Sequence, residues 1–502
     1  MITQLASGYF FYLDSFGINC ATCGRQTMRR KEKKDVVVIG NGPSAISLSY
    51  MLAGNWPYYS SDKQHPNQYL HNRLTTCNTR NIDDANEEHM KSDEISLVEQ
   101  DLEVLCNGLE GRSINPVAVL FDTLQRPDAD FGSDQPSCLE WRYSSSNSVD
   151  HIVLGKGRPG GAWDRMSECM ETLTVSFSQW MQLPGMCMKS WKHETTQASS
   201  RTSLGDVARY YKEYVKRQGL EKYFRNNATV TEVRFDDSTN LWHVCGWQDT
   251  VGAFEYVTPK VVLATGNSDV PNKLNVSGED LPFVLHSVSQ LETVLHKTNR
   301  SKLDHPILIV GAGLSAADAV IACQQSQVPV KHVFRRHPDD PSLIFNQLPE
   351  NIYPEYHDVH SNMKGNNTGF KYQPLAMHSV AEIKNNKEVV LHNIIGGDES
   401  NAKSRVTFKV SYVLVLIGKK PSVQFIKPSS LRQTLPHDPD QPLNTRSNPI
   451  SIDPFSHQVI RVDGLYAMGP LVGDNFVRFI QGGALAIVND LRKQRRKIED
   501  SL

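Results

Sequence analysis

The chain has 502 residues, about three domain lengths, and its 53 Lys and Arg against 55 Asp and Glu leave a formal net charge of −2. This balance excludes the large basic surface of a nucleic-acid-binding protein and a strong attraction to anionic membranes. The chain is 39% hydrophobic and can bury a sizeable core, yet it contains no run of 18 apolar residues, so no membrane-spanning helix is expected.

The N-terminal stretch is interpreted as a tail. A basic run at residues 29–34 follows the weakly apolar residues 9–13, which is the reverse of a secretory signal. Cys20 and Cys23 form a C-x-x-C pair, but no second pair follows as a zinc site would need. The nine cysteines show no disulfide framework, which favours a reducing compartment such as the cytoplasm.

The first buried strand is predicted at residues 35–39, where β-branched residues run without interruption up to a glycine. A helix is expected at 44–53. Residues 62–150 are polar and broken by Asn, Asp, Ser and Pro, so they are interpreted as an insertion of surface helices and loops, with one amphipathic helix at 95–105.

The rest of the chain alternates strands and helices, as in a parallel sheet covered by helices. Strands are expected at 152–154, 228–235, 241–247, 260–264, 306–310, 330–334, 412–417 and 464–468, with helices at 203–218, 315–325 and 482–496. Residues 338–405 are expected to be rich in loops.

A G-x-G-x-x-A turn occurs twice, each time between an apolar strand and a helix. The first Gly permits a tight turn, the second lets the backbone approach a pyrophosphate, and the small third residue lets helix and strand pack closely. The helix N-terminus then offers free N–H groups to the phosphates. The predicted binding residues are Gly40, Gly42, Pro43, Ser44 and Ala45 in the first turn, and Gly311, Gly313, Ser315 and Ala316 in the second.

The residues after the next strand indicate which nucleotide each turn binds. Arg335 and Arg336 follow the strand at 330–334, and an Arg there accommodates a 2′-phosphate, so the second turn is predicted to bind NADPH. The alternative is that the two arginines are simply solvated surface charges. At the first turn, Asp62 is the candidate for the acid that reads the ribose of FAD, after a poor strand at 56–59.

Further motifs resemble those of flavin monooxygenases with two dinucleotide sites. They are the loop of Gly160–Trp163, the strand and turn Val261–Gly266, and the segment Gly464–Asp474. The resemblance implies that Gly161, Trp163, Gly266, Gly473 and Asp474 contact FAD, with Asp474 hydrogen-bonded to the ribityl chain. Trp163, like Trp180, is otherwise an ordinary core residue.

Two stretches are similar to the lysine and ornithine N-hydroxylases, at 173–183 and 342–354. This likeness places Asn346 at the position of an active-site Asn, where it would hydrogen-bond the reacting oxygen or the nicotinamide amide; alternatively it satisfies its own loop backbone. Thr174 and Gln179 stand where that branch carries Gln and Lys, so its amino-acid substrate does not transfer.

Longer strings resemble the oxidative stress-induced growth inhibitor family. They lie at 36–45, 100–113, 115–124, 153–163, 340–360 and 469–486, so two of them fall inside the segment 62–150. This resemblance implies a role in growth control, stress response or cytokinesis, and a cytoplasmic protein with a cytoskeletal or midbody association.

Together these features predict an α/β protein with two Rossmann-like domains of the flavin-monooxygenase type. The expected boundaries are a tail at 1–34, an FAD domain at 35–300 containing the insertion 62–150, an NADPH domain at 301–420, and a return to the FAD domain at 421–502. The FAD domain is therefore discontinuous.

The expected activity is that of a monooxygenase. NADPH passes a hydride to FAD, oxygen forms a flavin hydroperoxide, and one oxygen atom goes to a nucleophilic substrate or leaves as hydrogen peroxide. The alternative is a weakly catalytic regulatory flavoprotein that binds protein partners through residues 62–150. A disulfide reductase is disfavoured because no cysteine lies between Gly42 and Cys77. No metal is expected: His357 and His360 form the best pair but lack a third ligand.

Overall fold

A computed structural model describes residues 30–60, 62–76, 95–166, 172–192, 201–297, 303–366, 371–394 and 405–501. Cys20 and Cys23 lie outside these residues. The predicted α/β class is confirmed, because the continuous apolar runs form parallel strands that are buried on both faces.

The first parallel sheet has the order β24-β12-β2-β5-β8. Its strands are β24 Leu465–Ala467, β12 Lys260–Leu263, β2 Val36–Ile39, β5 His151–Leu154 and β8 Phe224–Arg225. The sheet combines strands from both ends of the chain, so the predicted discontinuous domain is confirmed.

A second five-stranded sheet shares a hydrophobic core with the first and has the order β1-β11-β10-β9-β23. Its strands are β1 Arg30–Lys33, β9 Ala228–Asp236, β10 Leu241–Gln248, β11 Gly252–Thr258 and β23 Ile426–Lys427. The expectation that residues up to 34 form a tail is wrong for β1, because this basic segment pairs in parallel with β11.

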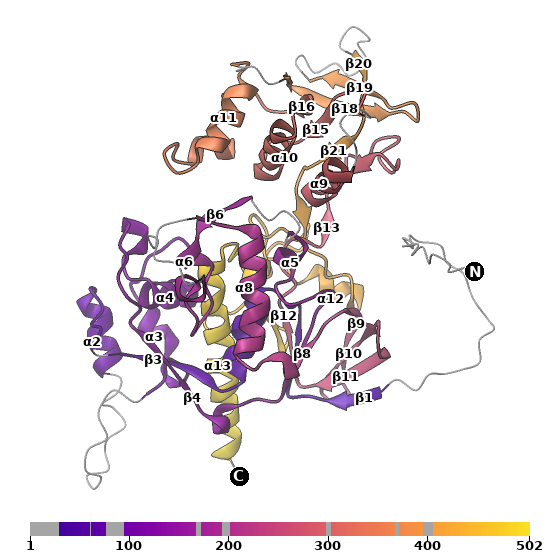
Figure 1. Cartoon of the computed structure of the whole chain (residues 1–502). Coiled ribbons are helices and arrows are strands. Elements are labelled where there is room, and N and C mark those ends of the chain that lie inside the picture. The colour runs from indigo at the N-terminus through magenta and orange to yellow at the C-terminus, as the bar shows by residue number, and fades with distance from the viewer. Residues whose placement is uncertain are drawn as a thin grey trace, which may run out of the picture.

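The second parallel sheet has the order β14-β21-β15-β16-β17, built from β14 Val284–Leu285, β15 Ile307–Val310, β16 Val330–Phe334, β17 Tyr372–Ala376 and β21 Val413–Val415. Helices α9 Val288–Lys297, α10 Leu314–Gln325 and α11 Pro354–Met363 belong to the same body, seen in rose and orange at the top of Figure 1. Since β14 pairs with β21, the chain enters this sheet before the boundary expected at residue 300.

Residues 338–405 are more regular than expected. Besides α11 and β17 they contain β18 His378–Ile383 and β19 Glu388–Asn393, which form a small antiparallel sheet with β20 Arg405–Lys409. The loop-rich prediction is therefore wrong. Buried residues such as Val389 and Leu391 are flanked by polar ones in these short strands, so the sequence shows no long apolar run.

Two regions of contact between the bodies are seen among the described residues. The strands β13 Val270–Pro271 and β22 Lys419–Lys420, where the chain crosses, pair antiparallel. The hairpin of β6 Leu173–Phe177 and β7 Arg201–Ser203 reaches α11, where Arg201 Nη2 lies 2.7 Å from Glu355 Oε1 and Tyr353 donates a hydrogen bond to the Val175 carbonyl at 2.6 Å.

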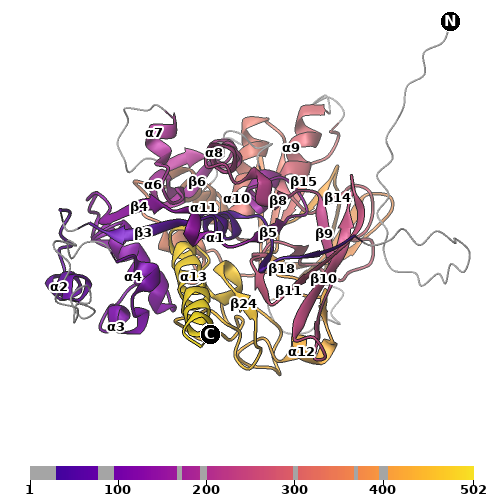
Figure 2. The same ribbon diagram turned by 90° about the horizontal axis from the view of Figure 1, so that it is seen from below.

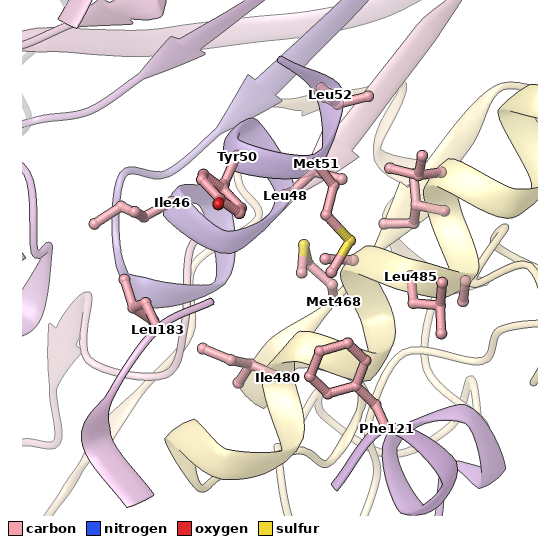
Figure 3. Close-up of a cluster of buried hydrophobic side chains, with 14 of the residues drawn as sticks. Ile46, Leu48, Tyr50, Met51, Leu52, Phe121, Leu183, Met468, Ile480 and Leu485 are labelled. Atoms are coloured by element: carbon pink, nitrogen blue, oxygen red, sulfur yellow. The ribbon is translucent and has the colours of Figure 1, made fainter. Parts of the chain in front are cut away.

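The core of the first body lies between α1 Pro43–Leu52, α4 Pro116–Gln125 and α13 Val477–Glu499. Figure 2 shows α4 beside the yellow α13, and Figure 3 shows Phe121 of α4 among buried side chains of α1 and α13. The expectation that 62–150 holds only surface helices and loops is thus wrong: α4 carries an apolar face into the core.

The helix α13 begins at Val477, five residues before the predicted start at 482. The pair Gly482-Gly483 looks like a helix boundary in the sequence, but it serves packing. A β-carbon built on Gly482 would lie 2.3 Å from the Cα of Ala118, so the glycine lets α13 and α4 approach closely.

A buried ion pair also ties α4 to α13. Arg478 Nε donates to both carboxylate oxygens of Asp122, at 3.0 and 3.1 Å, and Arg126 Nη1 donates to Asp122 at 3.1 Å. Breaking such a pair leaves a buried charge, so these residues fix the position of α4.

The single amphipathic helix expected at 95–105 is two short helices, the 3-10 helix η2 Leu97–Glu99 and α3 Leu102–Cys106. Ser96 and Asp101 each accept backbone N–H bonds as N-caps, and the second cap interrupts the helix. The adjacent strands β3 Asn55–Tyr59 and β4 Leu139–Tyr143 form a separate antiparallel pair.

The remaining helices are α2 Gln68–Thr76, α5 Ala162–Met166, α6 Ser178–Met181, α7 Met188–Lys192, α8 Leu204–Arg217 and α12 Ser429–Gln433. Short 3-10 helices lie at η3 Ala129–Phe131, η4 Ser145–Asn147, η5 Glu221–Tyr223, η7 Ile344–Gln347 and η9 Gly469–Val472.

Candidate functional site

The first glycine-rich turn connects β2 to α1 at the carboxyl end of the first sheet. Gly40 has φ +111, and a β-carbon there would lie 2.2 Å from the carbonyl oxygen of Ala264. A β-carbon on Gly42 would meet no atom within 4 Å. The turn therefore needs glycine at its first position for the backbone conformation and at its second position to keep the surface open.

The second turn repeats this geometry between β15 and α10. Gly311 has φ +136, its β-carbon would lie 2.3 Å from the carbonyl oxygen of Leu416, and Gly313 again faces open space. Ala45 and Ala316 are both fully buried, as the third position of each turn requires. Each turn thus presents a backbone cradle that a side chain on the second glycine would fill.

Both helices begin without a side-chain cap. Gly42 and Gly313 are the N-cap residues of α1 and α10. Because glycine has no side chain, neither can accept a hydrogen bond from the free N–H groups in the first turn of its helix. Pro43 is the first residue of α1, and Ser315 is exposed in the first turn of α10. The uncapped termini leave partial positive charge available to phosphate groups.

The loop Gly160–Trp163 packs directly on the first turn. Gly161 has φ +59, and its β-carbon would lie 2.9 Å from the Cα of Gly42. The amide of Gly160 donates to the Asn41 carbonyl at 3.0 Å. Trp163 is partly buried, with its ring edge-on to Tyr211 at 6.5 Å between centroids. The structure thus brings this predicted loop to the predicted turn.

Gly266 lies at the same end of the sheet, in the turn that follows β12. Its φ is +72, and a β-carbon there would meet no atom within 4 Å. Because the Ala264 carbonyl at the end of this strand lies against Gly40, the motif Val261–Gly266 also borders the first turn.

The C-terminal segment completes this group. Gly469 has φ +67 and its β-carbon would lie 2.3 Å from Ser44 Oγ, so the segment packs against α1. Gly473 has φ +95, and a β-carbon there would lie 2.8 Å from Ile114 Cδ1. Asp474 follows it and is only 1% exposed.

The Asp474 carboxylate is incompletely satisfied. Ser113 Oγ donates to Oδ1 at 2.6 Å, whereas Oδ2 has no hydrogen-bond partner among the described residues. Burial raises the pKa of Asp474 to about 7, against the lowering effect of hydrogen bonds from Ser113 and Asn115. A buried carboxyl with an unused oxygen fits a ligand that carries hydroxyl groups.

The predicted role of Asp62 needs correction. Asp62 is exposed and follows β3, which pairs with β4 and not with the first parallel sheet. The strand beside β2 is β5, so the ribose-reading position lies after Leu154. The segment 62–150 separates β5 from β2 in the sequence, so the prediction chose β3, the next strand along the chain, and not β5, the neighbour of β2 in the sheet.

Arg335 and Arg336 lie at the end of β16, next to β15, as predicted. Arg335 is exposed and has no hydrogen-bond or ion-pair partner in the described part of the chain. Arg336 Nη1 instead donates to Ser342, at 2.6 Å to Oγ and 3.2 Å to the carbonyl oxygen. Of the two, Arg335 is the one whose guanidinium is available to a ligand.

Asn346 lies in η7 and is exposed. Its Nδ2 donates to the Asp340 carbonyl at 3.0 Å, a local contact of the kind expected of a loop asparagine. Its contact with the reacting groups stays a prediction.

Three residues of the site were not predicted: Ser113, Asn41 and His332. His332 donates from Nε2 to the Gly311 carbonyl at 2.6 Å and accepts at Nδ1 from Tyr372 at 2.7 Å. Complete burial lowers its pKa to about 4, so it is neutral at pH 7 and holds the second turn without adding charge. A histidine inside a buried strand was the available signal.

No set of three His, Cys, Asp or Glu residues within the described ranges could hold a metal ion. His357 and His360 each bond a backbone carbonyl through Nε2, of Leu348 at 2.7 Å and of Pro338 at 2.8 Å. In the same part of the chain, no helix combines the length and apolar character needed to cross a membrane.

Comparison with known proteins agrees with this geometry. Residues 143–447 match the family model of the pyridine nucleotide-disulphide oxidoreductases. The chain is 41% identical over 500 residues to oxidative stress-induced growth inhibitor 2 of Homo sapiens, covering 92% of this chain and 94% of the relative.

Solved structures share the fold at low sequence identity. Bacillithiol disulfide reductase from Bacillus cereus superposes with a TM-score of 0.57 at 15% identity, covering 92% of this chain and 100% of that one. Ornithine hydroxylase from Pseudomonas aeruginosa gives 0.54 at 13% identity, covering 92% and 99%. The same fold therefore occurs in a disulfide reductase and in a hydroxylase, and the fold by itself does not indicate which of the two activities a chain has.

Proposed function

Because the chain belongs to the oxidative stress-induced growth inhibitors and to the pyridine nucleotide-disulphide oxidoreductase family, we propose that it is an FAD- and NADPH-dependent monooxygenase. The observation that carries this proposal is the pair of open turns, in which Gly42 and Gly313 each leave space for a pyrophosphate. The buried carboxyl of Asp474 supports placing the flavin at the first turn, because Gly469 of the same segment packs against Ser44 of α1.

In this proposal FAD lies against Gly40–Ala45, the loop at Gly161 and Trp163, Gly266, and Gly473-Asp474. NADPH lies against Gly311–Ala316, with Arg335 at its 2′-phosphate and Arg336 beside it, held by Ser342. When bound, the flavin supplies the redox chemistry: it accepts a hydride from NADPH, and its reduced form passes electrons to oxygen.

The protein's own residues bind and orient these groups. The uncapped termini of α1 and α10 stabilise phosphate charge, and Asp474 holds ribityl hydroxyl groups. Because the pKa of Asp474 is raised to about 7, its carboxyl is partly protonated at neutral pH and can donate or accept a hydrogen bond. His332 fixes the carbonyl of Gly311 and thereby the second turn.

The oxygen atom is proposed to go to a nucleophilic substrate or to leave as hydrogen peroxide. This activity would act in the cytoplasm, in growth and stress regulation. The competing function is regulation through protein partners with little turnover. It is favoured by large aromatic residues exposed on the segment 62–150, where Tyr69 is 82% and Phe131 is 90% exposed.

Purified protein with added FAD tests the proposal through the ratio of hydrogen peroxide formed to NADPH consumed. A monooxygenase gives a ratio near one without substrate and a lower ratio when a nucleophilic amine or thiol is oxygenated. Protein that binds FAD but consumes no NADPH supports the regulatory alternative, and protein that cannot be loaded with FAD contradicts both.

A further inference from the structure

The end of β5 lacks the acid that dinucleotide-binding folds carry there. β5 is the neighbour of β2 in the sheet, and a carboxylate after this strand normally bonds the adenosine ribose 2′-hydroxyl. Here Leu154 is followed by Gly155, Lys156 and Gly157. The Lys156 ammonium is paired with Asp269 at 3.1 Å.

The side chain of Asn41 occupies the place of the missing side chain. A β-carbon built on Gly155 would lie 2.0 Å from Asn41 Nδ2 and 2.1 Å from Cγ. Asn41 is the middle residue of the first turn and is 4% exposed. An amide from the turn therefore stands where the side chain of residue 155 would begin.

The hydrogen bonds of Asn41 leave one acceptor unused. Its Nδ2 donates to the Gly157 carbonyl at 2.8 Å, and because a carbonyl only accepts, this bond fixes the amide orientation. Asn41 Oδ1 accepts no hydrogen bond from the described residues. It remains available to a hydroxyl donor.

We propose that Asn41 reads the adenosine ribose of FAD, in place of an acid on β5. The inference rests on the proposed function, because it takes the first turn as the flavin site. Asn41 Oδ1 accepts a hydrogen bond from the 2′-hydroxyl while Nδ2 keeps the loop after β5 in place. The ribose is thus recognised by a neutral group.

A ligand comparison tests the inference on folded apoprotein. FAD and an FAD analogue that carries 2′-deoxyadenosine are titrated by flavin fluorescence. Wild-type protein should bind FAD about tenfold more tightly than the analogue, the value of one good hydrogen bond. In Asn41→Ala the two ligands should bind equally, and because both are measured on one variant, a general loss of stability does not affect the comparison.

The outcomes separate the two proposals. Wild-type protein that binds neither ligand contradicts the proposed function. Wild-type protein that binds both equally, or an Asn41→Ala variant that keeps the preference for FAD, overturns the role of Asn41. Loss of the preference in Asp62→Ala would overturn it as well, because the acid after β3 would then be the ribose reader.

An exchange of side chains provides a second test. Gly155→Glu alone should weaken FAD binding at least tenfold, since its β-carbon collides with Asn41. Asn41→Gly combined with Gly155→Glu removes the collision and restores an acceptor at the strand end, so affinity should return to within about threefold of wild type. A double variant no better than Gly155→Glu contradicts the inference.

Discussion

Arg335 offers the most direct route to the nucleotide preference of the second turn. It follows β16, is exposed, and has no partner in the described part of the chain. Arg335→Ala should therefore leave folding stability within about 0.5 kcal/mol of wild type. A charge-assisted hydrogen bond to a phosphate is worth about 2 kcal/mol, which corresponds to roughly a thirtyfold rise in the Kd for NADPH.

The assay is anaerobic stopped-flow reduction of the bound flavin over a range of NADPH and NADH concentrations. Arg335→Ala should raise the Kd for NADPH and leave that for NADH unchanged, because NADH has no 2′-phosphate. Higher ionic strength should reduce the preference of the wild type, since an exposed charge pair is screened.

Arg336→Ala is the matched control. Its guanidinium is held by Ser342, so its removal should loosen the 340–342 loop and weaken both nucleotides to a similar extent. Equal losses of NADPH and NADH affinity in Arg335→Ala would refute the 2′-phosphate role, and no loss of either would show that the nucleotide lies elsewhere.

Three further predictions concern the Asp474 carboxyl, the second turn and the core. Burial raises the pKa of Asp474 from 3.8 to about 7, so its contribution to stability is complete below pH 3.8 and is lost as pH rises through 7. The free energy of unfolding of the apoprotein should therefore fall by up to about 4 kcal/mol over this window. Thermal unfolding measured against pH should be flatter in Asp474→Asn than in wild type, and an unchanged profile would contradict the burial of this carboxyl. Gly313→Val places its side chain in open space, so protein with normal FAD content should lose reduction by NADPH; loss of FAD as well would show that the turns are assigned wrongly. Phe121→Ala should cost about 3–5 kcal/mol in urea unfolding because Phe121 is fully buried, whereas Phe131→Ala, at a 90% exposed site, should cost under about 0.5 kcal/mol; similar losses would contradict the core position of α4.

The parts of the fold that local chemistry determines could be predicted from the sequence. The turn glycines at Gly40 and Gly311 were recognisable because a strand, a tight turn and a helix are specified within a dozen residues. The central strands of both parallel sheets, such as β2 and β15, were found because burial on two faces makes them continuously apolar. The edge strands β8, β14 and β17 were missed.

Features that depend on distant pairing could not be predicted. Asp62 was chosen because it follows the next strand in sequence, whereas β5 is the next strand in the sheet. Ser113 bonds Asp474 across 361 residues, and no local pattern announces this contact. Gly482 resembled a helix boundary because the need for a close approach to Ala118 is visible only once α4 and α13 are packed.

The central claim is that the two turns hold FAD and NADPH in one protein so that electrons pass between them. Anaerobic titration of FAD-loaded protein with NADPH tests this claim directly. The reaction is followed by the absorbance of the oxidised flavin at about 450 nm. Complete bleaching at about one NADPH per flavin is the predicted result. A bound flavin that stays oxidised in excess NADPH, while dithionite reduces it, would contradict the account.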